Sequence, residues 1–159
     1  MSTNNNLRQR LRGNELTLGT WIQAASPAVA ELLASQPFDW ITIDCEHGII
    51  DLKDVAAMVT AIEARGIPAL VRLPFCDGTW IRRVLDTGAS GIIVPIVNTP
   101  EIAREAVTWA KYPPQGQRGF GFSLANTYGA DFARYVASAN DKVVVIAQIE
   151  HVLGVKNVD

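Results

Sequence analysis

The 159-residue sequence predicts an α/β fold built on a parallel sheet, and three observations support this. Short β-prone runs alternate with segments of helical periodicity, without a linker or low-complexity stretch between them. Polar residues gather at the carboxyl ends of four successive predicted strands. No dinucleotide-binding or P-loop glycine fingerprint is present, because "GQRGFG" has neither spacing. A parallel sheet forms either a barrel or a doubly wound layer, and the last two observations favour a (β/α)8 TIM barrel.

Five strands and the helices between them are predicted in order along the chain. Each strand candidate is a short apolar, β-prone run, and each helix candidate has apolar residues three and four positions apart. The strands are residues 16–23, 40–46, 68–73, 91–97 and 143–150. The helices are residues 27–35, 52–66, 78–88, 99–112 and 129–141. Because parallel strands need right-handed crossovers, these helices are expected to cover the sheet.

The length bounds how much of a barrel this chain can form. A complete (β/α)8 barrel typically takes about 250 residues. We therefore expect residues 1–159 to be a single domain, the N-terminal part of a barrel with five or so β/α units, and the chain to be truncated after strand five.

The composition excludes some partners. Fourteen basic and sixteen acidic residues give a formal charge of -2, which offers no general attraction to nucleic acid or an anionic membrane. The segment "MSTNNNLRQRLRGN" lacks the apolar core of a signal peptide, and no apolar stretch is long enough to cross a bilayer. We expect a cytoplasmic protein. Its cysteines, Cys45 and Cys76, have no metal-binding spacing and are expected to be free buried thiols rather than a disulfide or a nucleophile.

Charged residues interrupt the apolar run "WITIDCEHGII" where the second strand should end. Asp44, Glu46 and His47 fall within four positions, and Arg72 ends the third predicted strand. The loops at the carboxyl ends of parallel strands converge on one mouth, so these side chains are expected to form a site. Arg72 could hold a substrate carboxylate bidentately or serve as a structural clamp.

The fifth strand adds two polar residues to the same edge. Gln148 and Glu150 should point to one side of the strand, and His151 to the other, where a structural role is expected. A buried carboxylate needs a cation or hydrogen-bonding partner. A hard divalent ion such as Mg²⁺ or Mn²⁺ would suit Glu150, and a structural ion pair with Arg72 is the alternative.

An imidazole can act as a general base near neutral pH, so His47 is a candidate base, provided that an acidic partner orients its ring. Asp86, just before the fourth strand, is a candidate for this partner and could equally be a turn residue. None of the four lysines falls at a strand's carboxyl end, so no Schiff-base nucleophile is placed within this segment.

Five motifs in register carry a resemblance to a known family. "IDCEHG", "VRLP", "LDTGASGIIVPIV", "YPPQGQRGFG" and "AQIE" resemble the HpcH/HpaI family of class II, metal-dependent pyruvate aldolases from about residue 7 onward. Such enzymes include 4-hydroxy-2-oxoheptanedioate, 2-dehydro-3-deoxyglucarate and 2-keto-3-deoxyrhamnonate aldolases. The resemblance implies a barrel of the phosphoenolpyruvate/pyruvate type. It also implies a lyase that reversibly cleaves a 4-hydroxy-2-oxo acid to pyruvate, or a close 2-oxo acid, and an aldehyde.

The resemblance also implies roles for particular residues. Glu150 would be one of two carboxylate ligands of a divalent ion, Mg²⁺ or Mn²⁺ with Co²⁺ as a further candidate. Arg72 would bind pyruvate, and His47 would be the catalytic base, oriented by Asp86. The remaining implied residues are Asp44 and Glu46, which would support the site by hydrogen bonding, Gln148 beside the metal and pyruvate, and Trp21 at the mouth.

One departure from the family pattern leaves alternatives open. The family's second metal carboxylate lies on a Gly-Pro-x-Asp-Leu-Ser segment after the next strand, and this sequence ends before it. A homo-oligomer, trimer or hexamer, is expected for the full-length protein. The alternatives are a citrate-synthase-like enzyme of siderophore biosynthesis on the same scaffold, or a non-catalytic barrel fragment.

Overall fold

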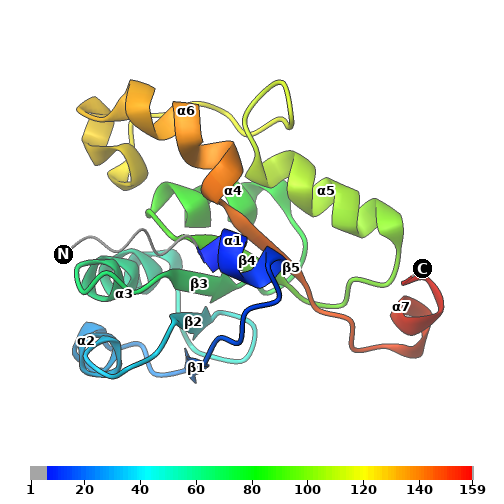
Figure 1. Cartoon of the computed structure of the whole chain (residues 1–159), viewed down its shortest axis with the longest axis horizontal. Coiled ribbons are helices and arrows are strands. Elements are labelled where there is room, and N and C mark those ends of the chain that lie inside the picture. Colours follow the sequence, from blue (N-terminus) through cyan, green and yellow to red (C-terminus); the bar gives the residue numbers. More distant parts are fainter. Residues whose placement is uncertain (1–6, 159) are drawn as a thin grey trace.

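The computed structural model describes residues 7–158, which form consecutive β/α units around one parallel sheet (Figure 1). The strands are β1 (Gly19–Ile22), β2 (Trp40–Asp44), β3 (Ala69–Arg72), β4 (Gly91–Val94) and β5 (Val144–Ala147). They pair in sequence order, β1-β2-β3-β4-β5, and every pair is parallel. A doubly wound sheet reverses its strand order at a switch point, whereas a barrel does not. The predicted parallel fold is confirmed, and its strand order is that of successive barrel units.

The predicted helices also form, within a few residues of their expected bounds. They are α2 (Pro27–Ala34), α3 (Leu52–Glu63), α4 (Gly78–Asp86), α5 (Pro100–Ala110) and α6 (Phe132–Lys142). Four of them begin at a side chain that accepts a backbone N–H: Ser26, Asp51, Asp77 and Thr99. Such caps satisfy donors that the first helical turn leaves unpaired. No helix within residues 7–158 is long and apolar enough to cross a membrane.

The two faces of the sheet carry different residues. Alternate residues of β2, such as Ile41 and Ile43, are fully buried in the main core with the helices. The other residues of the strand face the other side, where Trp40 packs in a smaller cluster with Leu70 and Val144. This alternation follows from the two-residue period of a strand. The second face corresponds to the interior of a barrel.

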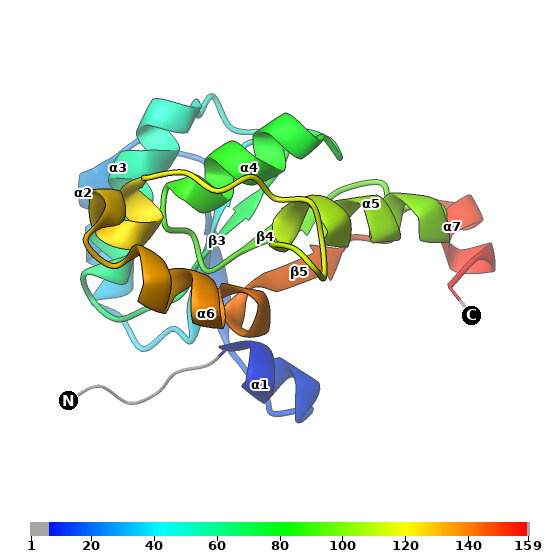
Figure 2. The ribbon, with the colours of Figure 1, turned by 90° about the horizontal axis from the view of Figure 1, so that it is seen from above.

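A short helix that was not predicted, α1 (Leu7–Arg12), covers the foot of this interior face. Leu7 is 3% exposed and packs with Leu70 and Val144, and Leu11 lies against the same cluster. Figure 2 shows α1 across the sheet from α3 and α4. The apolar floor therefore leaves only the carboxyl ends of the strands for a polar site. Residues 1–6 of the segment predicted to lack a signal peptide lie outside the described residues.

Two further short elements follow α5 and β5. η1 (Leu124–Gly129) lies between α5 and α6, and α7 (Val152–Lys156) follows the fifth strand. Asn126, 1% exposed, organises η1, because its amide oxygen accepts the Ser123 and Gly129 N–H groups and its amide nitrogen donates to the Gly121 carbonyl. This stretch is thus a hydrogen-bonded turn.

Glu63, the last residue of α3, joins three segments at the foot of the sheet. Its Oε1 atom accepts the Ala69 N–H at 3.0 Å and the Ser90 hydroxyl at 2.7 Å. Burial raises the pKa of Glu63, and these hydrogen bonds only partly offset that effect. A carboxyl group whose pKa is raised by folding holds more protons in the folded than in the unfolded state. Its contribution to stability therefore falls as pH rises from its unfolded pKa through its folded one.

Replacing Glu63 with Gln should raise the thermal midpoint at pH 7, because the amide oxygen can still accept both hydrogen bonds without the buried charge. The gain should shrink as pH falls toward about 4, where wild-type Glu63 is also protonated. Thermal unfolding of both proteins from pH 4 to 8 measures this difference. Glu105→Gln, on the exposed side of α5, is the control and should change the midpoint little. A lower midpoint for Glu63→Gln at pH 7 would contradict the account.

Candidate functional site

The ends of β2 and β3 bring a carboxylate and a guanidinium together. Asp44 and Arg72 are register partners at the last position of each strand. Arg72 Nε donates to Asp44 Oδ1 at 2.9 Å and Nη2 donates to Oδ2 at 2.6 Å, a bidentate pair. The Asp44 side chain is 1% exposed and that of Arg72 is 12% exposed. Parallel pairing in register is therefore what creates this contact.

Asp44 has further donors beyond Arg72. The side-chain amide of Gln23 donates to Oδ2 at 2.8 Å, and the backbone N–H groups of Glu46 and His47 donate to Oδ1. Burial alone would raise the pKa of Asp44, but the hydrogen bond from Arg72 and the three other donors outweigh burial and hold that pKa well below its usual range. Asp44 is therefore an anion that fixes both Arg72 and the turn after β2.

The turn after β2 folds back closely on the strand. A side chain at Gly48 would place its Cβ 2.4 Å from the Asp44 carbonyl oxygen, so only glycine fits there. Glu46 lies in this turn with Oε2 3.0 Å from Arg72 Nη1, in an ion pair. The His47 ring is 67% exposed, and its Nε2 is 4.0 Å from Glu46 Oε2. The turn thus presents His47 to solvent beside the guanidinium.

Trp21 of β1 completes this side of the site. The Arg72 guanidinium carbon is 4.9 Å from the centroid of the Trp21 ring, within the range of a cation–π contact. An open cleft of about 400 Å³ is lined by Trp21, Gln23, Asp44, Arg72 and Gln148. The cleft therefore lies at the carboxyl ends of β1, β2, β3 and β5, above the apolar floor.

The fifth strand ends earlier than predicted. β5 stops at Ala147, so Gln148 and Glu150 lie in the segment after it, and Glu150 is exposed rather than buried in the interior. The two side chains still meet, because Gln148 Nε2 donates to Glu150 Oε2 at 2.6 Å. The expected strand to residue 150 was wrong by three residues.

A backbone group of the loop after β4 also holds Glu150. The Ile96 N–H donates to Glu150 Oε1 at 2.9 Å, and Ile96 has φ 52°, which is unusual for a β-branched residue. The hydrogen bonds from Gln148 and Ile96, and then the charges of Arg72 and His47, lower the pKa of Glu150. The predicted alternative, an Arg72–Glu150 ion pair, is not among the ion pairs of residues 7–158, where Arg72 pairs with Asp44 and Glu46.

Asp86 has a different partner from the one predicted. It ends α4, beside the turn that leads into β4, and its Oδ1 accepts from Arg118 Nη2 at 2.8 Å. His47 instead follows the carboxyl end of β2, at the other end of the sheet. Within residues 7–158 the structure thus brings together every predicted site residue except Asp86, whose role in orienting His47 stays a prediction.

The remaining candidate residues have structural contacts. Both cysteines are free, and burial, followed by the charges of Asp44, Asp51 and Asp54, raises the pKa of Cys45 to about 12. Cys76 is only half-buried. His151 caps α7, its Nδ1 accepting the Leu153 N–H at 3.1 Å.

Two contributors were not predicted from the sequence. Gln23 directly follows β1, just as Asp44 is the last residue of β2. The expectation that polar residues at the carboxyl ends of strands form the site could therefore have identified it. Ile96 acts through its backbone N–H, for which its side chain gives no sequence signal.

The site has an excess of negative charge. Asp44, Glu46 and Glu150 face one guanidinium, and His47 is the other ionisable group beside them. Divalent ions prefer oxygen ligands, and Glu150 with the Gln148 amide oxygen offers such donors. Among residues 7–158, however, no group of three or more His, Cys, Asp or Glu side chains could hold a metal ion. The described residues thus offer oxygen atoms of the kind that divalent ions prefer, without a full set of ligands.

The sequence of this chain is similar to those of proteins that are named as aldolases. The chain is 42% identical over 156 residues to a 4-hydroxy-2-oxovalerate aldolase of Novosphingobium aromaticivorans, covering 98% of this chain and 59% of that protein. It is 36% identical to a hydroxypyruvate/pyruvate aldolase of Roseovarius nubinhibens, covering 98% and 61%. The chain thus spans about three fifths of the length of these relatives.

Solved structures agree with the fold. A HpcH/HpaI aldolase/citrate lyase family protein from Burkholderia cenocepacia superposes with a TM-score of 0.89 at 37% identity, covering 97% of this chain and 63% of that one. The citrate synthase SbnG superposes with a TM-score of 0.84 at 32% identity, covering 97% and 59%. The family model HpcH/HpaI aldolase/citrate lyase matches residues 17–159. With its strand-end cleft and this match, the chain belongs to the HpcH/HpaI aldolase/citrate lyase family.

Proposed function

We propose that the protein carrying this chain is a carbon–carbon lyase, which reversibly cleaves a 4-hydroxy-2-oxo acid into pyruvate, or a close 2-oxo acid, and an aldehyde. The observation that carries the proposal is the fixed guanidinium of Arg72 in the cleft, beside His47 and Glu150. The names of relatives such as the 4-hydroxy-2-oxovalerate aldolase support this class of reaction. Substrate and aldehyde would enter over Trp21.

Arg72 would bind the 2-oxo acid. A guanidinium has five N–H groups. Two of those of Arg72 donate to Asp44, and one Nη1–H faces Glu46. The remaining N–H groups can meet a substrate carboxylate or the oxygen that becomes negative as the bond breaks. The hydrogen bond to Asp44 raises the pKa of Arg72, so the positive charge is permanent.

His47 would move the proton. In the cleavage direction its ring takes the proton of the C4 hydroxyl, the C3–C4 bond breaks, and C4 leaves as the aldehyde carbon. The electron pair of that bond remains on the pyruvate part as an enolate, which is then protonated at C3. Asp44 and Glu46 would support this step by holding Arg72 and the turn that carries His47.

We propose a divalent metal ion, Mg²⁺ or Mn²⁺ with Co²⁺ as a further candidate, as the cofactor. Glu150 would be one of its ligands, with Gln148 beside it. When bound, such an ion acts as a Lewis acid toward the 2-oxo group. The excess of carboxylates in the site supports this proposal, and the remaining ligands would lie outside residues 7–158.

A citrate-synthase-like reaction is the second candidate, because of the superposition on SbnG. Accumulation of citrate from oxaloacetate and acetyl-CoA, without aldol cleavage, would favour it. We also propose a cytoplasmic homo-oligomer, trimer or hexamer, that binds neither nucleic acid nor membrane. Size-exclusion chromatography with light scattering tests the assembly.

His47→Ala and Arg72→Ala should each lower turnover of 4-hydroxy-2-oxovalerate by at least ~100-fold, a typical loss for a general base or an oxyanion stabiliser. Steady-state release of pyruvate measures this. Arg72→Lys keeps the charge without the bidentate fork and should also be impaired. Circular dichroism checks that each variant folds, since Arg72 pairs with a buried carboxylate. Turnover within a few-fold of wild type in both alanine variants would disprove these roles.

Asp44→Asn should destabilise the protein by about 3 kcal/mol at pH 7, because it removes one partner of a buried ion pair. The pKa of Asp44 is lowered by folding, so its contribution is present above the unfolded pKa and is lost as pH falls through the folded one. Below pH 4 the wild-type protein should therefore lose stability more steeply than the variant. Urea unfolding from pH 2 to 7 measures both slopes, and parallel curves would contradict the assignment.

A further inference from the structure

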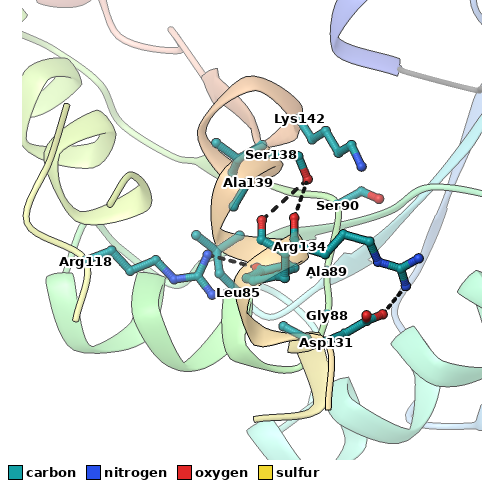
Figure 3. A pocket seen from close by; sticks show the side chains of 13 residues that line it. Leu85, Gly88, Ala89, Ser90, Arg118, Asp131, Arg134, Ser138, Ala139 and Lys142 are labelled. Atoms are coloured by element: carbon teal, nitrogen blue, oxygen red, sulfur yellow. Dashed lines mark hydrogen bonds and ion pairs between the residues drawn. The ribbon is translucent and has the colours of Figure 1, made fainter. Parts of the chain in front are cut away.

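A second cavity lies at the opposite end of the sheet from the cleft. It is open to solvent, has a volume of about 370 Å³ and is lined by the end of α4, residues 88–90 before β4, η1 and α6 (Figure 3). Its residues precede β4 and β5, whereas Arg72 and Glu150 follow strands. We call it the basic pocket, defined by Arg118, Arg134, Lys142, Ser90, Ser138 and Tyr135.

The basic pocket has more positive than negative side chains. Of its three cations, Arg118 pairs with Asp86 and Arg134 pairs with Asp131. Lys142 has no ion pair among residues 7–158. In Figure 3, Arg118 enters from one side of α6, and Arg134 and Lys142 extend on the other. Lys142 therefore has no carboxylate partner of its own, and the buried Glu63 carboxylate lies next to the pocket, where it accepts the Ser90 hydroxyl.

Arg118 is buried with an unused donor. Its side chain is 1% exposed, and its guanidinium carbon is 4.7 Å from the Tyr112 ring centroid and 5.8 Å from that of Tyr135. Nη1 donates to the Tyr135 hydroxyl at 3.1 Å and Nη2 to Asp86, but Nε has no partner among residues 7–158. A buried donor without an acceptor costs free energy, and this one would meet a ligand oxygen only if the wall of the pocket moved.

The rest of the wall is apolar. Leu85, Ala89, Ala139 and Val143 line the pocket together with the hydroxyls of Ser90 and Ser138. A volume of this size is at the small end of ligand sites, whose walls are mostly apolar with a few polar groups. An inorganic ion alone would leave the apolar wall without contact.

We propose that the basic pocket binds a small organic anion, a carboxylate or a phosphate monoester, at a site separate from the catalytic cleft. Its anionic group is held by Lys142 and Arg134, which extend on the same side of α6, and its carbon skeleton contacts Leu85 and Val143. Arginine's planar fork suits either type of anion. The proposal does not depend on the aldolase reaction, because none of the cleft residues contributes to the pocket.

The test is a titration of the whole protein with glycerol 3-phosphate and, separately, with succinate, followed by backbone amide NMR. We expect saturable shifts at residues 88–90 and 138–142 below about 10 mM, the weak end of small-molecule affinity. Shifts with glycerol 3-phosphate alone assign a phosphate monoester, and shifts with succinate alone assign a carboxylate. No saturable shift at these residues with either probe would overturn the proposal.

Variants separate the pocket from the cleft. Lys142→Glu should weaken binding at least ~10-fold, the effect of reversing one nearby charge in a partly buried site. Lys53→Glu, the same change on the exposed side of α3, is the matched control and should leave binding unchanged. Arg72→Ala should also leave it unchanged, even if the proposed lyase activity is absent. Equal loss in Lys142→Glu and Lys53→Glu, or loss in Arg72→Ala, would contradict the assignment.

Discussion

The bidentate pair between Asp44 and Arg72 is the interaction on which the site depends. It exists because β2 and β3 run parallel and end in register, so a carboxylate and a guanidinium occupy adjacent positions. The pair is buried, and breaking one partner of such a pair is strongly destabilising. It also orders the chain around it, because Asp44 accepts the backbone N–H groups of the turn that carries Glu46 and His47.

The sheet shows how one face can be both core and site. Along β2, Ile41 and Ile43 pack against helices, and Trp40 and Asp44 face the interior. Leu7 and Leu11 of α1 cover this interior near the amino ends of the strands, so the polar side chains lie at the carboxyl ends. The basic pocket lies near the amino ends of β4 and β5 and is lined in part by the segments that precede these strands. The two ends of the strands thus support different chemistry.

Much of this was predictable from the sequence, because strand and helix periodicities are local and polar strand ends share one edge. That reasoning found Asp44, Arg72 and Glu150, and the resemblance to a family added roles. It could not find the Ile96 N–H, a backbone group aimed by an unusual φ angle. It also missed the contact between Asp86 and Arg118, since Arg118 lies 32 residues later and only the folded chain places them together.

In the function that we propose, the cleft around Arg72 and His47 forms and reprotonates the enolate of a 2-oxo acid. The most direct measurement is exchange of the pyruvate methyl hydrogens with solvent deuterium, followed by proton NMR in the presence of Mg²⁺ or Mn²⁺. We expect exchange in the wild-type protein that EDTA stops and that Arg72→Ala and His47→Ala reduce by at least ~100-fold. Absence of exchange with either metal, or equal exchange in both variants, would contradict it.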